Sequence, residues 1–220
     1  MDQPLADRVA AVAALDEPTR RRLYEHVVRH PTALSRDEIA TALGIPRATA
    51  AFHLEKLVGE DLLDVGYERR NGRSGPGAGR PAKVYRRSAR SVAVHLPDRR
   101  YDLAGHLLAT AVEEADRTGQ PVRATLERHA YRFGRQLGEN ADELVTALEE
   151  HGFEPRAEGD QVLLGNCPFH TLAREHTRTI CAMNLHLLDG LLAGMGDTGL
   201  TACLDPQPGQ CCVRLEPRSL

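Results

Sequence analysis

Hydrophobic and polar residues in the first third of the chain recur at the spacing of short helices. In LDEPTRRRLYEHVVRH, Leu15, Leu23 and Val27 fall on one face, and Pro18 suits a first helical turn. Pro31 ends this helix, because proline lacks the backbone N–H that the interior of a helix requires. The pattern therefore predicts an amphipathic helix that stops before Pro31.

Two more helices are predicted directly afterwards, joined by a glycine. Ser35 with Glu38 three residues later is a capping-box signature for the start of the first helix. Gly44 can adopt the positive φ that closes it. The next helix begins at Pro46 and buries an apolar stripe that includes Leu54. A helix, a short turn with glycine and a second helix form the helix-turn-helix pattern.

A β-hairpin with a long basic loop is predicted after the second of these helices. The β-prone stretches are residues 63–67 and 82–86, and the loop at 69–81 is rich in Gly, Pro and Arg. A hairpin in this position is a wing, and arginines at its tip can reach phosphates or an adjacent minor groove. The wing arginines are Arg69, Arg70, Arg73 and Arg80.

Charge is distributed unevenly along the chain. Residues 1–90 contain 16 Lys and Arg against 12 Asp and Glu, whereas residues 91–220 contain 12 against 19. Within residues 66–90, eight basic residues stand against one acidic residue, Glu68. A basic N-terminal part followed by an acidic part indicates a polyanion-binding module joined to a different domain.

Residues 15–87 resemble the winged helix-turn-helix of ArsR-like bacterial transcription regulators. The resemblance lies in LDEPTRRRLYEHV, in LSRDEIATALGIPRATAAFHLEKL and in GRPAKVYR, so it includes both helices and the wing in order. It implies binding of double-stranded DNA, with the N-terminal part of the recognition helix in the major groove. The alternative use of such a module is protein–protein contact.

Matching positions in that family imply which residues face the bases. Arg47 can pair with guanine edges, and Thr49 and Ala48 suit phosphate or thymine-methyl contact. Phe52 is expected to pack against the core rather than to read bases. The full set of candidates on the recognition helix is Arg47, Ala48, Thr49, His53 and, further toward the DNA backbone, Lys56.

Two longer helices are predicted in the middle of the chain. DLAGHLLATAVEEADRTG places Leu103, Leu107 and Ala111 on one stripe, and PVRATLERHAYRFGRQLG stops near Gly138. We expect these helices to form a homodimer interface; coverage of a C-terminal sheet is the alternative. A homodimer would place two recognition helices roughly 34 Å apart on an inverted-repeat operator.

Short helical and β-prone stretches alternate in the last third, which is typical of a small α+β domain. A helix in ADELVTALEEHGF precedes a helical region at 168–195, and the β-prone stretches are 153–156, 161–164, 200–204 and 212–215. The expected fold class is α+β. Its expected parts are an N-terminal winged helix-turn-helix domain at 1–90, helical dimerisation helices at 91–139 and a small C-terminal α+β sensor domain at 140–220.

All five cysteines lie in the last quarter of the chain: Cys167, Cys181, Cys203, Cys211 and Cys212. Cys167 precedes Pro168 and so sits near a helix N-terminus, where the helix dipole favours thiolate. Cys211 and Cys212 are adjacent beside a PQPGQ turn, an arrangement that packing of a hydrophobic core does not readily explain. Clustered cysteines in a cytosolic protein indicate metal binding or redox sensing, although free cysteines also fill cores.

Geometry limits how these cysteines can share one site. Cys167 and Cys181 are 14 residues apart, which is about 21 Å along a straight helix. A shared site therefore requires a bend between residues 174 and 177. A hairpin around the PQPGQ turn would pair Cys203 with Cys212. Because successive strand side chains point to opposite faces, we expect one of Cys211 and Cys212 to be a ligand.

The segment CPFHTLAREHTRTICAMNLHLLDGLL, together with PGQCC, resembles the C-terminal region of SufR-type iron–sulfur regulators of the same winged-helix group. The resemblance implies an iron–sulfur cluster bound by Cys167, Cys181 and Cys212, and control of genes for iron–sulfur assembly. The spacing departs from the family pattern, so the further ligand stays open. The candidates are Cys211, Cys203, His176, His170 or a small exogenous thiol.

Other interpretations of the C-terminal region also stay open. Zinc is the alternative cofactor, although only Cys167 with His170 has zinc-like spacing and scattered single cysteines suit a cluster better. A metal-free thiol switch, a small-molecule effector pocket and ordinary packing are further alternatives. An enzyme with Cys167 as nucleophile is not expected, because no Gly-rich phosphate loop, nucleophile elbow or acid–base pair is recognisable.

Composition indicates where the protein works. No run of about 18 apolar residues encodes a membrane span, and MDQPLADRVA lacks the features of a signal peptide. We therefore expect a cytoplasmic, homodimeric repressor. Its DNA binding would report redox or iron status through a cluster in the C-terminal domain.

Overall fold

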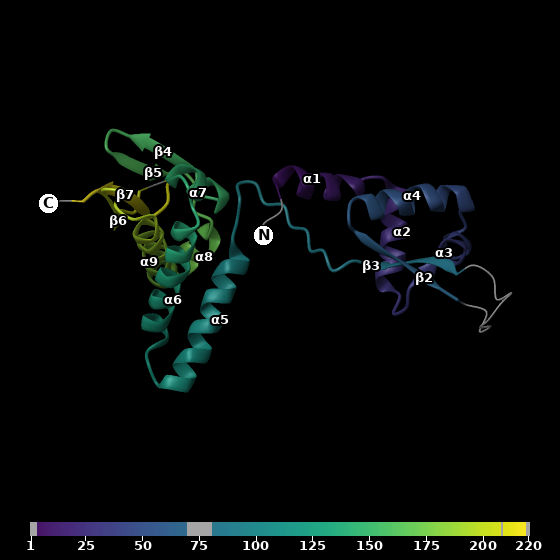
Figure 1. Cartoon of the computed structure of the whole chain (residues 1–220), viewed down its shortest axis with the longest axis horizontal. Coiled ribbons are helices and arrows are strands. Elements are labelled where there is room, and N and C mark those ends of the chain that lie inside the picture. Colours follow the sequence, from purple (N-terminus) through teal and green to yellow (C-terminus); the bar gives the residue numbers. More distant parts are fainter. Residues whose placement is uncertain (1–3, 70–80, 208, 219–220) are drawn as a thin grey trace. The chain divides into compact units, whose positions relative to one another are not determined.

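The computed structural model describes residues 4–69, 81–207 and 209–218 (Figure 1). The chain divides into two compact units, Met1–Val94 and His95–Leu220. Both units combine helices with an antiparallel sheet, so the fold class is α+β, as predicted. The finer division at residues 90 and 139 stays a prediction.

The first unit is a winged helix-turn-helix. Helices α2, α3 and α4 pack on one another around a core to which Leu23, Ile39 and Leu54 contribute fully buried side chains. Its three-stranded sheet has the order β1-β3-β2. The elements are α1 (Leu5–Ala14), α2 (Pro18–Arg29), β1 (Leu34–Ser35), α3 (Arg36–Leu43), α4 (Arg47–Gly59), β2 (Leu63–Glu68) and β3 (Ala82–Arg87).

The local signals that start and end α3 are confirmed. Ser35 Oγ accepts a hydrogen bond from the Glu38 backbone N–H at 3.3 Å, and the Glu38 carboxylate accepts one from the Ser35 N–H at 2.7 Å. Gly44 ends the helix with a φ of 65°. The turn between the two helices is short, because α3 ends at Leu43 and α4 begins at Arg47 with Pro46 as its N-cap.

Strands β2 and β3 form the predicted wing. Val65 lies opposite Tyr85 in their antiparallel pairing, and Leu34 of β1 lies opposite Tyr85 on the other side of β3. Residues 70–80 lie outside the described residues, so the roles of Arg70, Arg73 and Arg80 stay predictions. Arg69, at the end of β2, is exposed.

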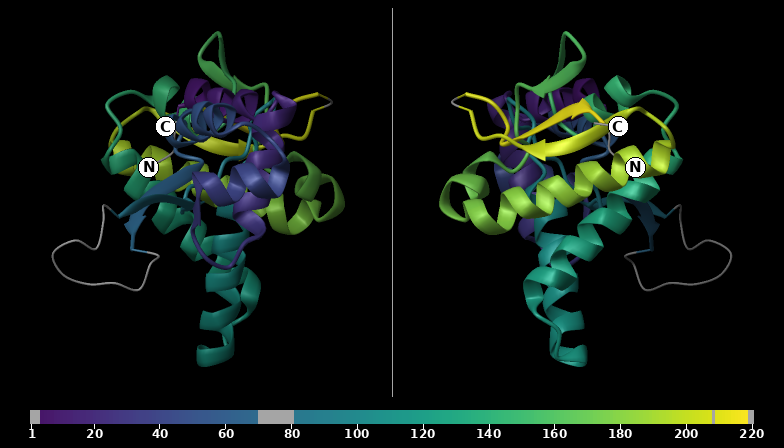
Figure 2. Two further views of the ribbon diagram at one scale, coloured as in Figure 1. Left: turned by 90° about the vertical axis from the view of Figure 1, so that its right-hand side faces the viewer. Right: turned by 90° about the vertical axis from the view of Figure 1, so that its left-hand side faces the viewer.

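The second unit combines three long helices with a four-stranded antiparallel sheet of order β4-β5-β7-β6. Helix α9 runs along the side of the sheet that β6 and β7 form (Figure 2). The elements are α5 (Tyr101–Thr118), α6 (Val122–Glu139), α7 (Leu144–Glu150), β4 (Pro155–Glu158), β5 (Gln161–Leu164), α8 (His170–Glu175), α9 (Thr177–Met195), β6 (Leu200–Leu204) and β7 (Val213–Pro217).

Helices α6 and α9 approach so closely that their backbones touch. A Cβ on Gly134 of α6 would lie 1.9 Å from the carbonyl oxygen of Leu187. A Cβ on Gly190 of α9 would lie 2.1 Å from the carbonyl oxygen of Tyr131. The same arrangement recurs one turn further along each helix, at Gly138 and Gly194. Glycine is therefore required at this crossing, which fixes α9 against α6.

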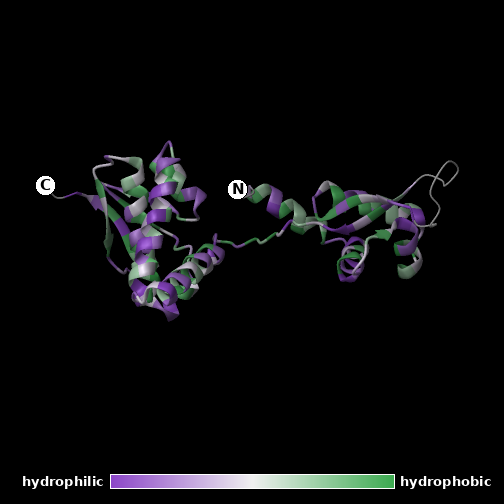
Figure 3. Cartoon of the chain, turned by 60° about the horizontal axis from the view of Figure 1, so that its bottom comes forward, coloured by the Kyte–Doolittle hydropathy of each residue, from purple (hydrophilic) through white to green (hydrophobic). Residues whose placement is uncertain are grey.

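The middle helices belong to the second unit. α5 packs on α6, and α6 packs mainly on α9. Hydrophobic and hydrophilic residues occupy different faces of the helices in both units (Figure 3). A dimerisation role for α5 and α6 stays a prediction. None of the helices in the described part of the chain has the length and apolar character that a bilayer crossing requires.

Candidate functional site

The outer face of α4 carries most of the predicted base-facing residues. Ala48, Phe52 and Lys56 are exposed and follow one another at intervals of four residues, so they form a single stripe. Arg47 at the helix start is 70% exposed, and its Nε lies 3.3 Å from Asp37 Oδ1. Phe52 is 59% exposed, so the expectation that it packs against the core is wrong.

His53 points away from this stripe. Its side chain is 12% exposed, and Nδ1 lies 3.3 Å from Glu17 Oε2. Glu17 is the N-cap of α2 and also accepts a hydrogen bond from the Thr19 backbone N–H at 2.9 Å. His53 therefore joins α4 to the start of α2. Thr49 is half-buried beside the stripe.

The wing is attached to α4 through Glu55. Lys83 Nζ lies 2.5 Å from Glu55 Oε1, and the Tyr85 hydroxyl donates to the same oxygen at 2.9 Å. The hydrogen bond from Lys83 lowers the pKa of Glu55, whereas burial and the contact with Glu55 raise the pKa of Tyr85. The negative charge on the exposed side of α4 is thus offset by a lysine of the wing.

Four of the five thiols meet in the second unit. Cys167 lies near enough to Cys211, Cys211 to Cys212, and Cys212 to Cys181 for each thiol to shift the pKa of its neighbour. We call these four residues the thiol cluster. They come from three segments: the loop before α8, the start of α9 and the loop before β7. Cys167 and Cys211 belong to the main core of the unit, Cys212 packs against that core, and Cys181 is buried.

A break in the helical region brings Cys167 and Cys181 together. α8 ends at Glu175 and α9 begins at Thr177, with φ −125° and ψ 45° at the intervening His176. The predicted bend is confirmed. The bend places Cys181 in the second turn of α9. Cys167 lies in the loop before α8, and its carbonyl accepts a hydrogen bond from the His170 N–H at 3.0 Å.

The geometry expected for Cys211 and Cys212 is wrong. Strand β7 begins only at Val213, and Cys203 lies opposite Arg214 rather than opposite Cys212. The Cys211 N–H donates to the Leu164 carbonyl of β5 at 2.9 Å, whereas the Cys212 carbonyl accepts from the Asp205 N–H at 2.8 Å. Strand alternation therefore does not apply, and both thiols join the cluster.

The other candidate ligands lie elsewhere among the described residues. Cys203 is on β6 beside Glu216 and Arg214, and burial followed by Glu216 raises its pKa. His170 and His176 are exposed on and after the short helix α8. The thiol cluster thus contains the three expected ligands, Cys167, Cys181 and Cys212, and one candidate further ligand, Cys211; their role as ligands stays a prediction.

The thiols of the cluster differ in acidity. Hydrogen bonding with Cys211, followed by burial, raises the pKa of Cys167 far above its ordinary value. The hydrogen bond from Cys212 lowers the pKa of Cys181, and the same contact raises that of Cys212 to about 12. Cys167 does not gain the thiolate character expected at a helix start, so it is poorly suited to act as a nucleophile.

The acidity of Cys211 reflects opposing contacts. The hydrogen bond with Cys167 lowers its pKa, but the contact with Cys212 and burial outweigh this and raise the pKa to about 12. The thiol also accepts a hydrogen bond from the amide of Asn184, with 3.2 Å between Nδ2 and Sγ. Asn184 is fully buried, and its Oδ1 lacks a hydrogen-bond partner among the described residues. The sequence signal for Asn184 is its place three residues after Cys181 on an apolar helix.

The donor chemistry of the thiol cluster fits a thiolate-bound metal group. Buried sulfur donors from several segments in apolar surroundings suit iron–sulfur clusters and zinc. Among the described residues, however, no three His, Cys, Asp or Glu side chains already stand at the positions needed to bind one metal ion. Binding of a metal group would therefore require the loops that carry Cys167, Cys211 and Cys212 to move.

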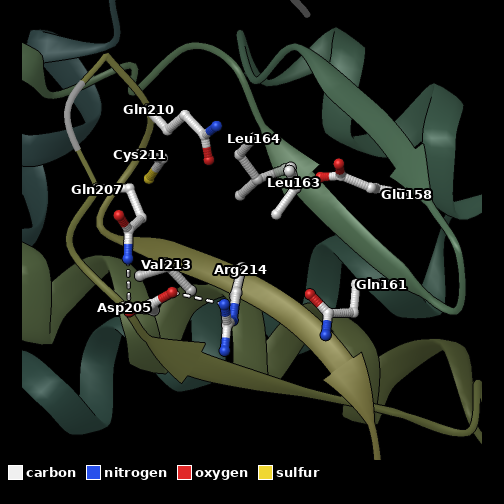
Figure 4. A pocket seen from close by; sticks show the side chains of 10 residues that line it. All are labelled: Glu158, Gln161, Leu163, Leu164, Asp205, Gln207, Gln210, Cys211, Val213 and Arg214. Atoms are coloured by element: carbon white, nitrogen blue, oxygen red, sulfur yellow. Dashed lines mark hydrogen bonds and ion pairs between the residues drawn. The ribbon is translucent and has the colours of Figure 1, made fainter.

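A pocket of about 220 Å³ reaches the thiol cluster from one side (Figure 4). Its wall includes Cys211, and its mouth carries an ion pair between Arg214 Nη1 and Asp205 Oδ2 at 2.5 Å. Gln207 Nε2 donates to the same aspartate at 3.1 Å. Pockets for drug-sized effectors are larger, at roughly 300–1,000 Å³, and mostly apolar. This pocket is better suited to admit water or a small solute to Cys211.

Residues 15–66 match the family model described as a helix-turn-helix domain. The match covers α2, α3 and α4 and reaches into β2. It supports a DNA-binding transcriptional regulator and favours a regulator over an enzyme. No curated protein matches the chain.

Proposed function

We propose that the protein is a transcriptional repressor that binds an iron–sulfur cluster through Cys167, Cys181, Cys211 and Cys212 and thereby senses redox or iron status. The observation that carries this proposal is the meeting of four thiols from three chain segments. They lie in the unit that follows the helix-turn-helix domain. A cluster would supply an oxygen-sensitive link between those segments.

The distribution of the cysteines along the chain supports a cluster over zinc. The irons of a cluster bind thiolates at separate positions, which suits single cysteines from three chain segments. Zinc sites more often use closely spaced Cys or His pairs, and Cys167 with His170 has such a spacing without a second pair. Zinc is accordingly the alternative outcome of the metal analysis.

The loop that carries Cys167 is bound to the start of α5. Asn166 Nδ2 donates to the carbonyls of Asp98 at 3.0 Å and Gly152 at 2.6 Å, and Arg99 Nη1 donates to Asn166 Oδ1 at 2.5 Å. The Arg100 N–H donates to the Pro168 carbonyl at 3.0 Å. A shift of Cys167 would therefore be passed to residues 98–100.

The last residues of the first unit, which lead to Asp98, are hydrogen-bonded to the rest of that unit. Arg8 Nη1 donates to the Ala93 carbonyl at 3.3 Å, and Arg90 Nη1 donates to the Glu60 carbonyl at 2.6 Å. Residues 94–97 connect these anchors to Asp98. We propose that this short connection couples the thiol cluster to DNA affinity, in the sense of a shared coupling free energy.

A homodimer on an inverted-repeat operator completes the proposal. Paired helix-turn-helix domains on half-sites one helical turn apart give such modules useful affinity. Leu5, Val9 and Val12 on α1 and Val112 on α5 are apolar residues at least 44% exposed, which supports contact with a second copy. Size-exclusion chromatography with light scattering tests the stoichiometry directly.

The regulatory function is tested by DNA affinity with and without the bound metal group. An operator is first selected from a random duplex pool with anaerobically purified protein. Its dissociation constant is then measured for loaded protein and for protein treated with a chelator under reducing conditions. We expect a difference of about fivefold or more, the lower range of allosteric coupling. Equal affinities would contradict the sensing role, while lack of any selected duplex would contradict DNA binding.

A further inference from the structure

The exposed face of α4 carries an aromatic side chain that the fold does not bury. Phe52 is 59% exposed and lies one turn from Ala48 and one turn from Lys56 on the same stripe. Its ring contacts His53 edge-on, with 5.2 Å between ring centroids. His53 itself is largely buried, with 3.3 Å between its Nδ1 and Glu17 Oε2. The centre of the stripe is therefore apolar and consists of Phe52 and Ala48.

The surroundings of this apolar centre are suited to a polyanion. Arg47 and Lys56 are exposed at either end of the stripe. The carboxylate of Glu55, which faces the same side, is paired with Lys83 of the wing. The N-terminus of α4 has no side-chain cap, so its first backbone N–H groups are available to a phosphate. Charge complementarity thus favours nucleic acid over an apolar protein surface.

The major groove of DNA presents one apolar group to such a surface, the C5-methyl of thymine. Phenylalanine and alanine contact that methyl group, and neither can hydrogen-bond to a base edge. We propose that Phe52, with Ala48, is a specificity determinant that reads thymine methyl groups in each operator half-site. This inference rests on DNA binding by α4 and is independent of the thiol cluster.

The test exploits deoxyuridine, which differs from thymidine only by the missing methyl. Full-length protein selects sites from a random duplex pool, and each thymine of the selected site is then replaced singly by deoxyuridine. We expect at least one replacement per half-site to weaken binding about fourfold, as the burial of one methyl-sized group requires. The F52A variant should bind the thymine and deoxyuridine duplexes equally well.

Matched variants separate a contact with DNA from an effect on folding. Y67A removes another exposed aromatic, on strand β2, and should keep the wild-type preference for thymine. F52L should retain part of the preference. Thermal unfolding of F52A should match wild type because the side chain is largely exposed.

Three results would overturn the inference: an unchanged preference in F52A, no deoxyuridine effect in the wild type, or a change of oligomeric state in F52A. The first two leave DNA binding intact, and the third assigns Phe52 to protein contact. A wild-type protein that selects no duplex would overturn DNA binding and this inference together.

Discussion

The buried amide of Asn184 donates a hydrogen bond to the sulfur of Cys211, with 3.2 Å between Nδ2 and Sγ. A hydrogen bond from N–H to a ligand sulfur stabilises the more negative, reduced state of a bound cluster. Asn184 lies on α9, which is fixed against α6 at the glycine crossing. The amide is therefore carried by a helix whose position against α6 is fixed, while it donates to the Cys211 sulfur.

Replacing Asn184 with leucine should lower the reduction potential of the loaded protein. Leucine fills a similar volume, and the lost hydrogen bond should change the free energy of unfolding of the metal-free protein by only about 1 kcal/mol. Spectroelectrochemical titration measures the potential, and denaturant unfolding measures the stability. An unchanged potential would show that the amide does not tune a bound group.

Replacing Gly134 with alanine should unfold or strongly destabilise the second unit. The added Cβ would lie 1.9 Å from a backbone carbonyl oxygen of Leu187, which cannot move aside as a flexible side chain would. We expect a loss of about 3 kcal/mol or more in the free energy of unfolding. The matched control is Gly105→Ala on α5, where a Cβ meets nothing within 4 Å. That variant should gain up to about 1 kcal/mol through helix propensity.

The contact between α5 and α6 predicts a pH dependence of stability. Hydrogen bonding from His129, and then from Arg128 at 2.7 Å, holds the pKa of Glu114 below its ordinary value. A lowered folded-state pKa contributes stability above the unfolded-state pKa, and this stability is lost as the pH falls through the folded value. Glu114→Gln should therefore melt earlier than wild type near neutral pH. The difference should shrink below about pH 4, and a constant difference would contradict the assignment.

Replacing Asn166 with leucine should weaken the link between the thiol cluster and DNA affinity. The variant loses the hydrogen bonds that connect the Cys167 loop to Asp98 and Arg99. The ratio of dissociation constants between metal-free and loaded protein should therefore move toward one, while iron content is retained. Asn140→Ala is the control, because its side-chain amide donates to a nearby carbonyl of α6, that of Gln136, at 2.6 Å. An unchanged ratio in Asn166→Leu would place the coupling elsewhere.

Local sequence signals predicted the first unit well. The capping box of Ser35 and Glu38, the closing Gly44 and the β-prone stretches around the wing act over a few residues, so their meaning does not depend on the rest of the fold. The break at His176 followed from a distance argument about Cys167 and Cys181. The exposure of the side chains on α4 was predicted less accurately, because the burial of His53 depends on its contact with Glu17, the N-cap of another helix.

Long-range contacts determine the features of the second unit that could not be predicted from the sequence. The position of Cys211 depends on its hydrogen bond to Leu164, far away in the chain, so the hairpin register could not be predicted from turn residues alone. The glycines at the crossing of α6 and α9 could not be recognised from either helix alone, because each glycine accommodates the backbone of the other helix. The partnership of Asn184 and Cys211 likewise appears only once α9 and the loop before β7 meet.

The most direct test of the account is the iron and acid-labile sulfide content of protein purified without oxygen. We expect coloured protein with comparable amounts of iron and sulfide in the wild type and in Cys203→Ser, whose thiol lies beside Glu216 outside the thiol cluster. Cys181→Ser and Cys212→Ser should lose most of both. Colourless wild-type protein with one zinc ion per chain, or full cluster content in Cys181→Ser, would contradict it.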